Sequence, residues 1–249
     1  MKKTIFTGAG LLLLSSFITA QYAHAAIALD RNRIIFDASQ TSLSLSISNQ
    51  NKNLPYLAQA WVEDDKGNKI EHPMTALPPL QRVEPGAKSQ VRVQLTGGAT
   101  PLPTDRETLF YFNLREIPPK SKTPNTLQIA LQTRVKLFYR PASLVLASDN
   151  ATVPQKQVTL TEQGGKFRLD NPTGYYVTIT QASTSEKSTP LPGFKAAMAA
   201  PKSSVMLSSG PAELGNHPVL TFINDYGGRP KLLFTCSGSH CKVTGMKVG

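Results

Sequence analysis

Residues 125–141 read NTLQIALQTRVKLFYRP, and apolar side chains recur at every second position along this stretch. Leu127, Ile129, Leu131, Val135 and Leu137 share one parity, while most residues between them are polar or basic. Successive side chains of a β-strand point to opposite faces, so the alternation predicts a strand. The run covers about 13 residues, against about 5–6 for a usual strand, which predicts an unusually long one.

Similar but shorter runs dominate the rest of the chain, and helical periodicity is almost absent. Pro, Gly, Asn and Asp separate the runs, and the chain contains 19 prolines. Short alternating strands at this spacing predict an all-β sandwich or barrel. The expected strands cover 42–48, 56–64, 89–95, 107–116, 127–140, 157–160 and 175–180.

The segment PASLVLASDNATVP, residues 141–154, follows the longest run and is bounded by two prolines. On either side of it lie about 100 residues, the size of one seven-stranded sandwich. We therefore expect two β-sandwich domains, one over residues 26–142 and one over 143–249.

The first 30 residues carry an export signal. Lys2 and Lys3 precede an apolar stretch that ends near Ala23-His24-Ala25. This order predicts a signal peptide over residues 1–25, cleaved after Ala25. The apolar core is shorter than the ~20 residues of a membrane span. We expect an exported protein without a membrane anchor.

The net charge of +11 at pH 7 favours acidic partners or surfaces. The basic residues are scattered, however, and no Lys/Arg run of the kind that binds nucleic acid occurs. Export argues further against a nucleic-acid partner.

Cys236 and Cys241 are the two cysteines, in the segment CSGSHC. In an oxidising compartment, a disulfide between them is the simplest interpretation. The alternative is a metal site with His240 as a third ligand. A structural zinc site needs four ligands, and neither His72 nor His217 has a matching spacing.

Motifs for catalysis are absent from the sequence. There is no glycine-rich phosphate loop and no GxSxG segment, and few histidines follow the expected signal peptide. We therefore expect a binding protein rather than an enzyme, without a cofactor or a metal. A secreted hydrolase has no support from motifs.

The segment LPTDRETLFYFNLREIPP (102–119) resembles the signature of PapD-like periplasmic chaperones of the chaperone–usher pilus pathway. Other segments resemble the same family, and especially its PapD branch, across both expected domains: ALDRNRIIF, NLPYLAQAWVED, RVEPGAKSQVRV, LQIALQTRVKLFYRP and INDYGGRP. The resemblance implies two immunoglobulin-like domains set at an angle, with a cleft between them, and a chaperone that works without ATP.

The resemblance also gives the long run a role. A pilin subunit lacks the last strand of its own sandwich, and the chaperone lends it a strand. The family implies that Leu127, Ile129 and Leu131 fill the pilin groove. From the alternation alone, ordinary core packing of these three side chains is the alternative.

Two cations are implied to hold the C-terminal carboxylate of the pilin: Arg33 on the first strand and Lys136 on the long strand. Two solvated surface charges are the alternative. Lys136 has the opposite parity to the donor residues, so a bulge, a strong twist or the length of the lysine side chain must reconcile them.

The resemblance implies two further sets of residues. An ion network between the domains involves Glu107, Arg140 and Asp225. A contact surface for the outer-membrane usher comprises Leu57, Gln59, Pro79 and Arg92. Leu77 stands where a small polar residue is expected, which weakens the assignment of the usher surface.

The expected function is that of a periplasmic chaperone that binds, folds and caps pilus subunits, including major, minor and adhesin subunits, and delivers them to the usher. Self-association of the free chaperone is left open. The alternative is a secreted two-domain adhesin or structural surface protein. The mid-chain position of the long run, with Arg33 upstream, favours the chaperone.

Overall fold

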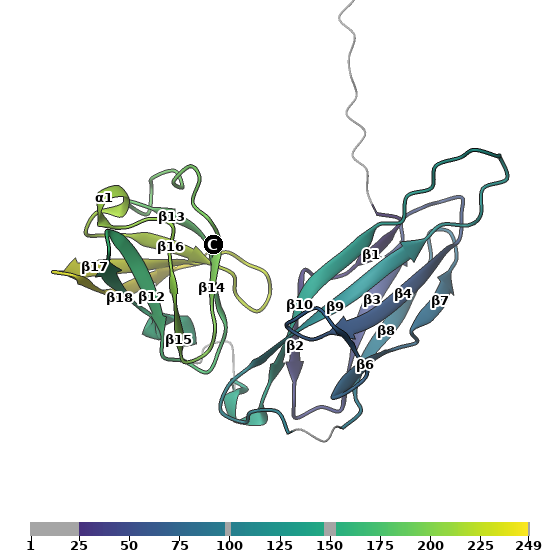
Figure 1. Cartoon of the computed structure of the whole chain (residues 1–249), viewed down its shortest axis with the longest axis horizontal. Coiled ribbons are helices and arrows are strands. Elements are labelled where there is room, and N and C mark those ends of the chain that lie inside the picture. Colours follow the sequence, from purple (N-terminus) through teal and green to yellow (C-terminus); the bar gives the residue numbers. More distant parts are fainter. Residues whose placement is uncertain (1–24, 98–100, 147–152, 249) are drawn as a thin grey trace, which may run out of the picture.

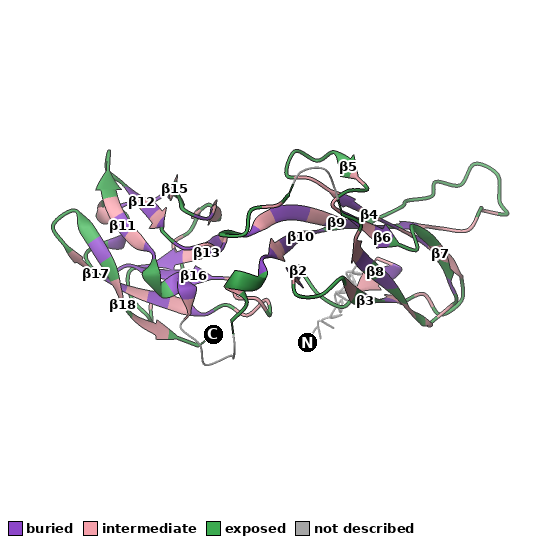
Figure 2. Ribbon diagram, turned by 90° about the horizontal axis from the view of Figure 1, so that it is seen from below, coloured by how far each residue is buried: buried purple, intermediate pink, exposed green. Residues whose placement is uncertain are grey.

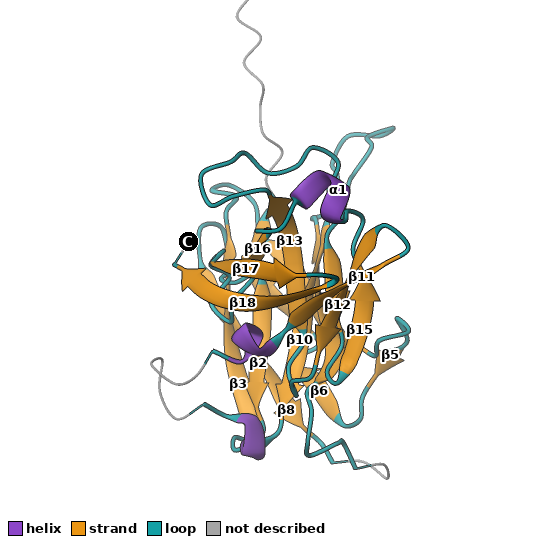
Figure 3. Ribbon diagram, turned by 90° about the vertical axis from the view of Figure 1, so that its left-hand side faces the viewer, coloured by secondary structure: helices purple, strands orange, loops and turns teal. Residues whose placement is uncertain are grey.

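The computed structural model describes residues 25–97, 101–146 and 153–248. Most of the expected signal peptide and part of the 141–154 segment lie outside these residues. The described chain forms two β domains that meet at one end (Figure 1). The predicted all-β, two-domain fold is confirmed, and helical segments are few and short (Figure 3).

Domain one contains two facing sheets. Four strands follow the order β1-β3-β8-β6, and the second sheet follows β2-β10-β9-β4-β5, with β7 paired to β4. The strands are β1 (Ile27–Leu29), β2 (Arg33–Asp37), β3 (Ser42–Asn49), β4 (Tyr56–Glu63), β5 (Lys69–Ile70), β6 (Met74–Leu77), β7 (Leu80–Val83), β8 (Lys88–Leu95), β9 (Thr108–Ile117) and β10 (Gln132–Arg140).

The N-terminal part of domain one changes sheets. β1 pairs antiparallel with β3 in the first sheet, and β2 pairs parallel with β10 in the second. The β2–β10 pairing places Arg33 directly opposite Lys136, although the two residues are far apart in sequence.

Alternating side chains form the core of domain one. Val135 and Leu137 of β10 pack in the same cluster as Leu45 of β3 and Val91 of β8. Each is less than 9% exposed, and each lies on the inward parity of its strand. Lys136 and Phe138 therefore lie on the outer face of the sheet, which is the face turned toward domain two.

Domain two is one sheet that folds around a second hydrophobic core, in the order β14-β13-β16-β17-β18-β11-β12-β15. Its strands are β11 (Thr159–Gln163), β12 (Lys166–Asn171), β13 (Val177–Ser183), β14 (Ala197–Ala199), β15 (Ser203–Met206), β16 (Val219–Phe222), β17 (Lys231–Ser237) and β18 (His240–Lys247). The helical segments are η1 (Ala142–Leu144), η2 (Pro154–Gln157) and α1 (Pro211–Leu214).

A disulfide joins Cys236 to Cys241 across the β17–β18 hairpin, where the two residues are direct partners with Cα atoms 3.8 Å apart. The predicted disulfide is confirmed, and the zinc alternative is wrong because both thiols are consumed. Among the described residues, no group of three His, Cys, Asp or Glu side chains could hold a metal ion.

The prediction of a single strand over residues 127–140 is wrong in its first part. β10 begins at Gln132, and residues 126–131 belong to no strand. The segment after β9 forms a long teal loop that projects from domain one (Figure 1) and is exposed along most of its length (Figure 2). β9 ends at Ile117, and Pro118 and Pro119 have no N–H to extend the ladder.

Candidate functional site

The two predicted anchor cations lie side by side at the edge of domain one. Arg33 of β2 and Lys136 of β10 are direct partners in a parallel pair, so both side chains leave the same face of the sheet. The register of β10 against β9 is unbroken from Gln132 to Tyr139. A bulge, one of the three ways considered for reconciling the parity of Lys136 with that of the donor residues, is therefore absent from this described pairing.

Arg33 reaches across to domain two. Its Nη1 atom donates hydrogen bonds to the carbonyl oxygens of Ile223 at 2.8 Å and Asn224 at 2.9 Å. Its guanidinium carbon lies 4.9 Å from the centre of the Phe138 ring. Burial lowers the pKa of the Arg33 guanidinium, although Asp225 and Glu107 oppose this effect.

Lys136 is half-buried beside Arg33. Burial lowers the pKa of its ammonium group, and the charge of Arg33 lowers it further. Within the described part of the chain, neither Lys136 nor Arg33 forms an ion pair, and the buried Nε of Arg33 has no hydrogen-bond partner. Two adjacent cations without a carboxylate partner are suited to binding an anion, and a carboxylate accepts such charge-assisted hydrogen bonds well.

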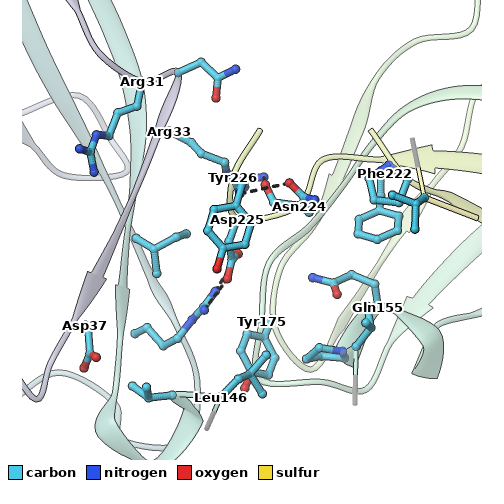
Figure 4. A pocket seen from close by; sticks show the side chains of 18 of the residues that line it. Arg31, Arg33, Asp37, Leu146, Gln155, Tyr175, Phe222, Asn224, Asp225 and Tyr226 are labelled. Carbon is cyan, nitrogen blue, oxygen red and sulfur yellow. Dashed lines mark hydrogen bonds and ion pairs between the residues drawn. The ribbon is translucent and has the colours of Figure 1, made fainter. Parts of the chain in front are cut away.

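A cleft of about 1050 Å³ opens beside Arg33, between the two domains. Figure 4 shows Arg31, Arg33 and Asp37 of domain one on one side, and Tyr175, Phe222 and Asn224 of domain two on the other. Arg33 is therefore among the side chains that line the cleft.

Arg140 connects the domains at the base of this cleft. It forms an ion pair with Glu107 of domain one at 2.7 Å and with Asp225 of domain two at 2.6 Å. The second carboxylate oxygen of Glu107 accepts a hydrogen bond from the backbone N–H of Tyr176 at 2.8 Å. The structure thus brings together all three residues of the predicted ion network.

The pKa values of the network follow from its burial. Burial alone would lower the pKa of Arg140, but the carboxylates of Asp225 and Glu107 raise it, so Arg140 stays charged. Burial raises the pKa of the Glu107 carboxyl against the opposing effect of Arg140. A buried charge network of this kind is sensitive to the loss of one partner.

The predicted donor residues are exposed in the free protein. The exposed fractions are 85% for Leu127, 66% for Ile129 and 38% for Leu131. The Leu131 carbonyl accepts a hydrogen bond from the Glu116 N–H at 3.0 Å, the last backbone link beyond β10. Core packing, the alternative interpretation of these side chains, is wrong for domain one itself.

The predicted usher residues lie on both sheets of domain one, near the passage of the chain from β6 to β7. Pro79 lies in this passage, and its carbonyl accepts a hydrogen bond from the Ala60 N–H at 2.9 Å. Gln59 pairs with Leu80, and Arg92 pairs with Leu77. Leu57 lies two residues before Gln59 on β4.

The surface near the passage from β6 to β7 is partly apolar, because the side chains of Leu77 and Leu80 are 40% and 49% exposed.

Sequence reasoning missed other contacts between the domains. The carbonyl groups of Ile223 and Asn224 hold Arg33, but every residue has a carbonyl group, so no sequence signal marks these two. Asp105 of domain one also forms an ion pair with Lys202 of domain two. The DRE segment suggested that charges matter here, but nothing in the sequence indicated Lys202 as a partner.

Solved structures with this architecture are chaperones. The periplasmic chaperone SfaE aligns with a TM-score of 0.64 and 29% identity, covering 83% of this chain and 98% of SfaE. The SafB chaperone, solved with the SafA pilin of Salmonella enterica, aligns with a TM-score of 0.68 and 25% identity, covering 87% and 99%. The fold and the cleft therefore define a two-domain pilus chaperone.

Sequence comparisons identify the family. Residues 26–145 match the model for "Pili and flagellar-assembly chaperone, PapD N-terminal domain", and residues 154–234 match "Pili assembly chaperone PapD, C-terminal domain". The chain is 51% identical to the chaperone protein PapD of Escherichia coli over 222 residues, 89% of this chain and 91% of PapD. It is 48% identical over 232 residues to the probable fimbrial chaperone YfcS of Escherichia coli strain K12, 93% of this chain and 90% of YfcS.

The chain belongs to the PapD family of pilus chaperones. These relatives support the chaperone over the alternative of a two-domain adhesin. The described residues contain no helix that is long and apolar enough to cross a membrane.

Proposed function

We propose that this protein binds pilus subunits by lending them the strand formed by residues 126–131, and passes them to an outer-membrane usher. The observation that carries this proposal is an exposed, unpaired run of alternating apolar residues that leads directly into β10. An open pilin groove needs both backbone partners and apolar side chains, and such a segment supplies both.

Burial of the donor side chains should contribute substantially to the free energy of binding. Burying each of the three aliphatic side chains of the donor segment is worth about 1.5–3 kcal/mol, before the cost of ordering the segment. An exposed apolar strand is otherwise prone to aggregation, so both partners benefit from the complex.

Arg33 and Lys136 bind the C-terminal carboxylate of the pilin in this proposal. Val135 and Leu137 point into the core of domain one, and Lys136 leaves the other face of the sheet, beside Arg33. If the ladder of β10 continues into a pilin, the donor residues point into the pilin core on the parity of Val135. The opposite parity of Lys136 then turns its ammonium group to the face that carries Arg33, and the anchor formed by these two cations fixes the register of the donor residues.

The other predicted sites have supporting roles in the same proposal. Glu107, Arg140 and Asp225 set the angle between the domains and so the width of the cleft. The surface around Leu57, Gln59, Pro79 and Arg92 contacts the usher. Residues 1–25 direct export and are removed after Ala25, and the domains divide near residue 142. Binding and release require neither ATP nor a catalytic step.

Purification from the periplasm of cells that make the corresponding pili tests this proposal. We expect a small pilin to elute with the chaperone at a 1:1 ratio, and its C-terminus to be protected from carboxypeptidase. Recovery of the chain without a stoichiometric pilin, under conditions in which pilins are present, would contradict the proposal.

A further inference from the structure

The loop of residues 223–228 in domain two, which connects β16 to β17, contacts domain one at three places. The carbonyls of Ile223 and Asn224 accept hydrogen bonds from Arg33. The Asp225 carboxylate pairs with Arg140. Gly227 lies so close to Asn32 that a Cβ atom on Gly227 would be 2.7 Å from Asn32 Oδ1. We name this segment the Arg33 loop.

Asn224 organises the Arg33 loop from within. Its side-chain Oδ1 accepts hydrogen bonds from the N–H groups of Tyr226 at 3.1 Å and Gly228 at 2.8 Å. Its backbone N–H donates to the Gly228 carbonyl, and its own carbonyl accepts from the Gly227 N–H, both at 3.1 Å. Asn224 thus fixes the turn whose carbonyl groups face Arg33.

The loop contacts leave other donors of Arg33 for a ligand. Nη1 is held by the two carbonyls, and Phe138 lies against the guanidinium group. Nη2 forms no hydrogen bond among the described residues and is left for a ligand, whereas Nε is buried and has no partner there either. A long arginine side chain loses considerable rotamer freedom when it binds a ligand, and holding it in advance reduces that cost.

We propose that the Arg33 loop positions Arg33 for the carboxylate of the pilin, with Asn224 as the positioning residue. Capture of the carboxylate then depends on domain two as well as on the strands of domain one. This inference rests on the proposed function, because it assumes that Arg33 binds a carboxylate.

The test compares two forms of one probe. A synthetic peptide with the sequence of the last strand of a pilin is prepared as the free C-terminal acid and as the C-terminal amide. We expect the wild-type chaperone to prefer the acid by about 10- to 100-fold, the range for hydrogen bonds to a charged group. The acid-to-amide ratio isolates the anchor from the rest of the binding surface.

Asn224→Ala removes the two side-chain hydrogen bonds that organise the loop. We expect the acid preference to fall to about threefold or less, with the affinity for the amide unchanged. Asn224→Ser retains an uncharged acceptor oxygen and should restore part of the preference. A general loss of structure would lower both affinities together, and Ser would not rescue it.

Two glycine variants provide a matched pair. Gly227→Ala places a Cβ against Asn32 at a residue with φ +83°, and should displace the loop and reduce the acid preference. Gly67→Ala imposes a similar backbone cost at φ +86°, in a turn of domain one with nothing within 4 Å of the added Cβ. Gly67→Ala should leave the acid preference unchanged.

The outcomes separate the two proposals. Equal binding of acid and amide by the wild-type protein would overturn the carboxylate anchor and hence the proposed function. A strong acid preference in the wild type that persists in both Asn224→Ala and Gly227→Ala would overturn the role of the loop alone.

Discussion

The two parts of the stretch 126–140 have similar alternating sequences and opposite environments. Leu137, in β10, is fully buried in the core of domain one, while Leu127, ten residues earlier, is 85% exposed. The difference lies in their neighbours. β9 and β2 both pair with β10, but the ladder with β9 ends at Gln132, and β2 reaches only as far as Lys136.

This comparison shows that alternation indicates a strand without indicating its partner. The second part of the stretch completes the sandwich of its own domain. The first part has the same pattern but extends past the ladders that β10 forms with both neighbouring strands, and we propose that a pilin supplies the missing neighbours. The predictions below test this division.

Leu137→Ala and Ile129→Ala should separate the two parts most clearly. Leu137→Ala leaves a cavity in the core and should reduce the free energy of unfolding by about 2–5 kcal/mol. Ile129→Ala should leave it unchanged, because Ile129 is 66% exposed in the free protein, and should instead weaken pilin binding. Urea denaturation and pilin titration measure the two effects. A large loss of stability in Ile129→Ala would show that the donor segment packs within its own domain.

Arg33→Ala should weaken pilin binding by about 2–5 kcal/mol, because it removes one partner of a partly buried charged contact. Isothermal titration with a purified pilin measures this. Arg168→Ala is the matched control, because Arg168 lies on β12 of domain two and pairs there with Asp170 at 2.8 Å. Equal affinities for Arg33→Ala and the wild type would remove Arg33 from the binding site.

Asp225→Ala should loosen the domains by removing one of the two carboxylates that hold Arg140. Asp225 is 35% exposed, so solvent screening limits the loss to about 1 kcal/mol. Small-angle X-ray scattering should show a broader distribution of interdomain distances, with both domains still folded.

The ion pair of Asp105 with Lys202 provides the control for this experiment. Both of its side chains are more than 40% exposed, so Asp105→Ala should change the scattering less than Asp225→Ala does. Identical profiles for Asp225→Ala and the wild type would contradict a role for the network in setting the interdomain angle.

Lys136→Met should have a small effect on stability and should remove its dependence on pH near the pKa of this lysine. The pKa of Lys136 is lowered below its ordinary value of 10.5, so the folded state loses this proton before the unfolded state does. Between the lowered pKa and 10.5, the stability of the free protein should rise with pH, while pilin affinity falls.

Methionine at position 136 should remove both pH trends and stabilise the free protein by about 0.5–1 kcal/mol, since the half-exposed lysine is partly screened. Lys88→Met, at an exposed position on β8, is the control. An unchanged pH profile in Lys136→Met would show that another group is responsible for the trends.

Much of the fold could be predicted from the sequence, because strands 42–48, 56–64 and 89–95 each bury one parity against a common core. The start of β10 at Gln132 could not, since the alternation continues without a break to Leu127 although the ladder with β9 ends at Arg115. Residue 157 was expected in a strand, but the chain forms the η2 turn there after Pro154.

Side chains of the site could be predicted from the sequence, whereas its backbone groups could not. Glu107, Arg140 and Asp225 stand in segments that resemble the family, and the structure brings them into contact. The backbone carbonyls that hold Arg33 leave no mark in the sequence, because their position depends on the turn around Asn224. Such contacts can be identified only from a structure that contains both domains.

Hydrogen exchange of the backbone amides of residues 126–140, with and without a bound pilin, tests the central claim most directly. In the free protein, we expect the paired amides of β10 to be protected and those of residues 127–131 to exchange rapidly. In the complex, residues 127–131 should become as protected as β10. Rapid exchange of residues 127–131 in a saturated complex would contradict the account, since the pilin would then be held elsewhere.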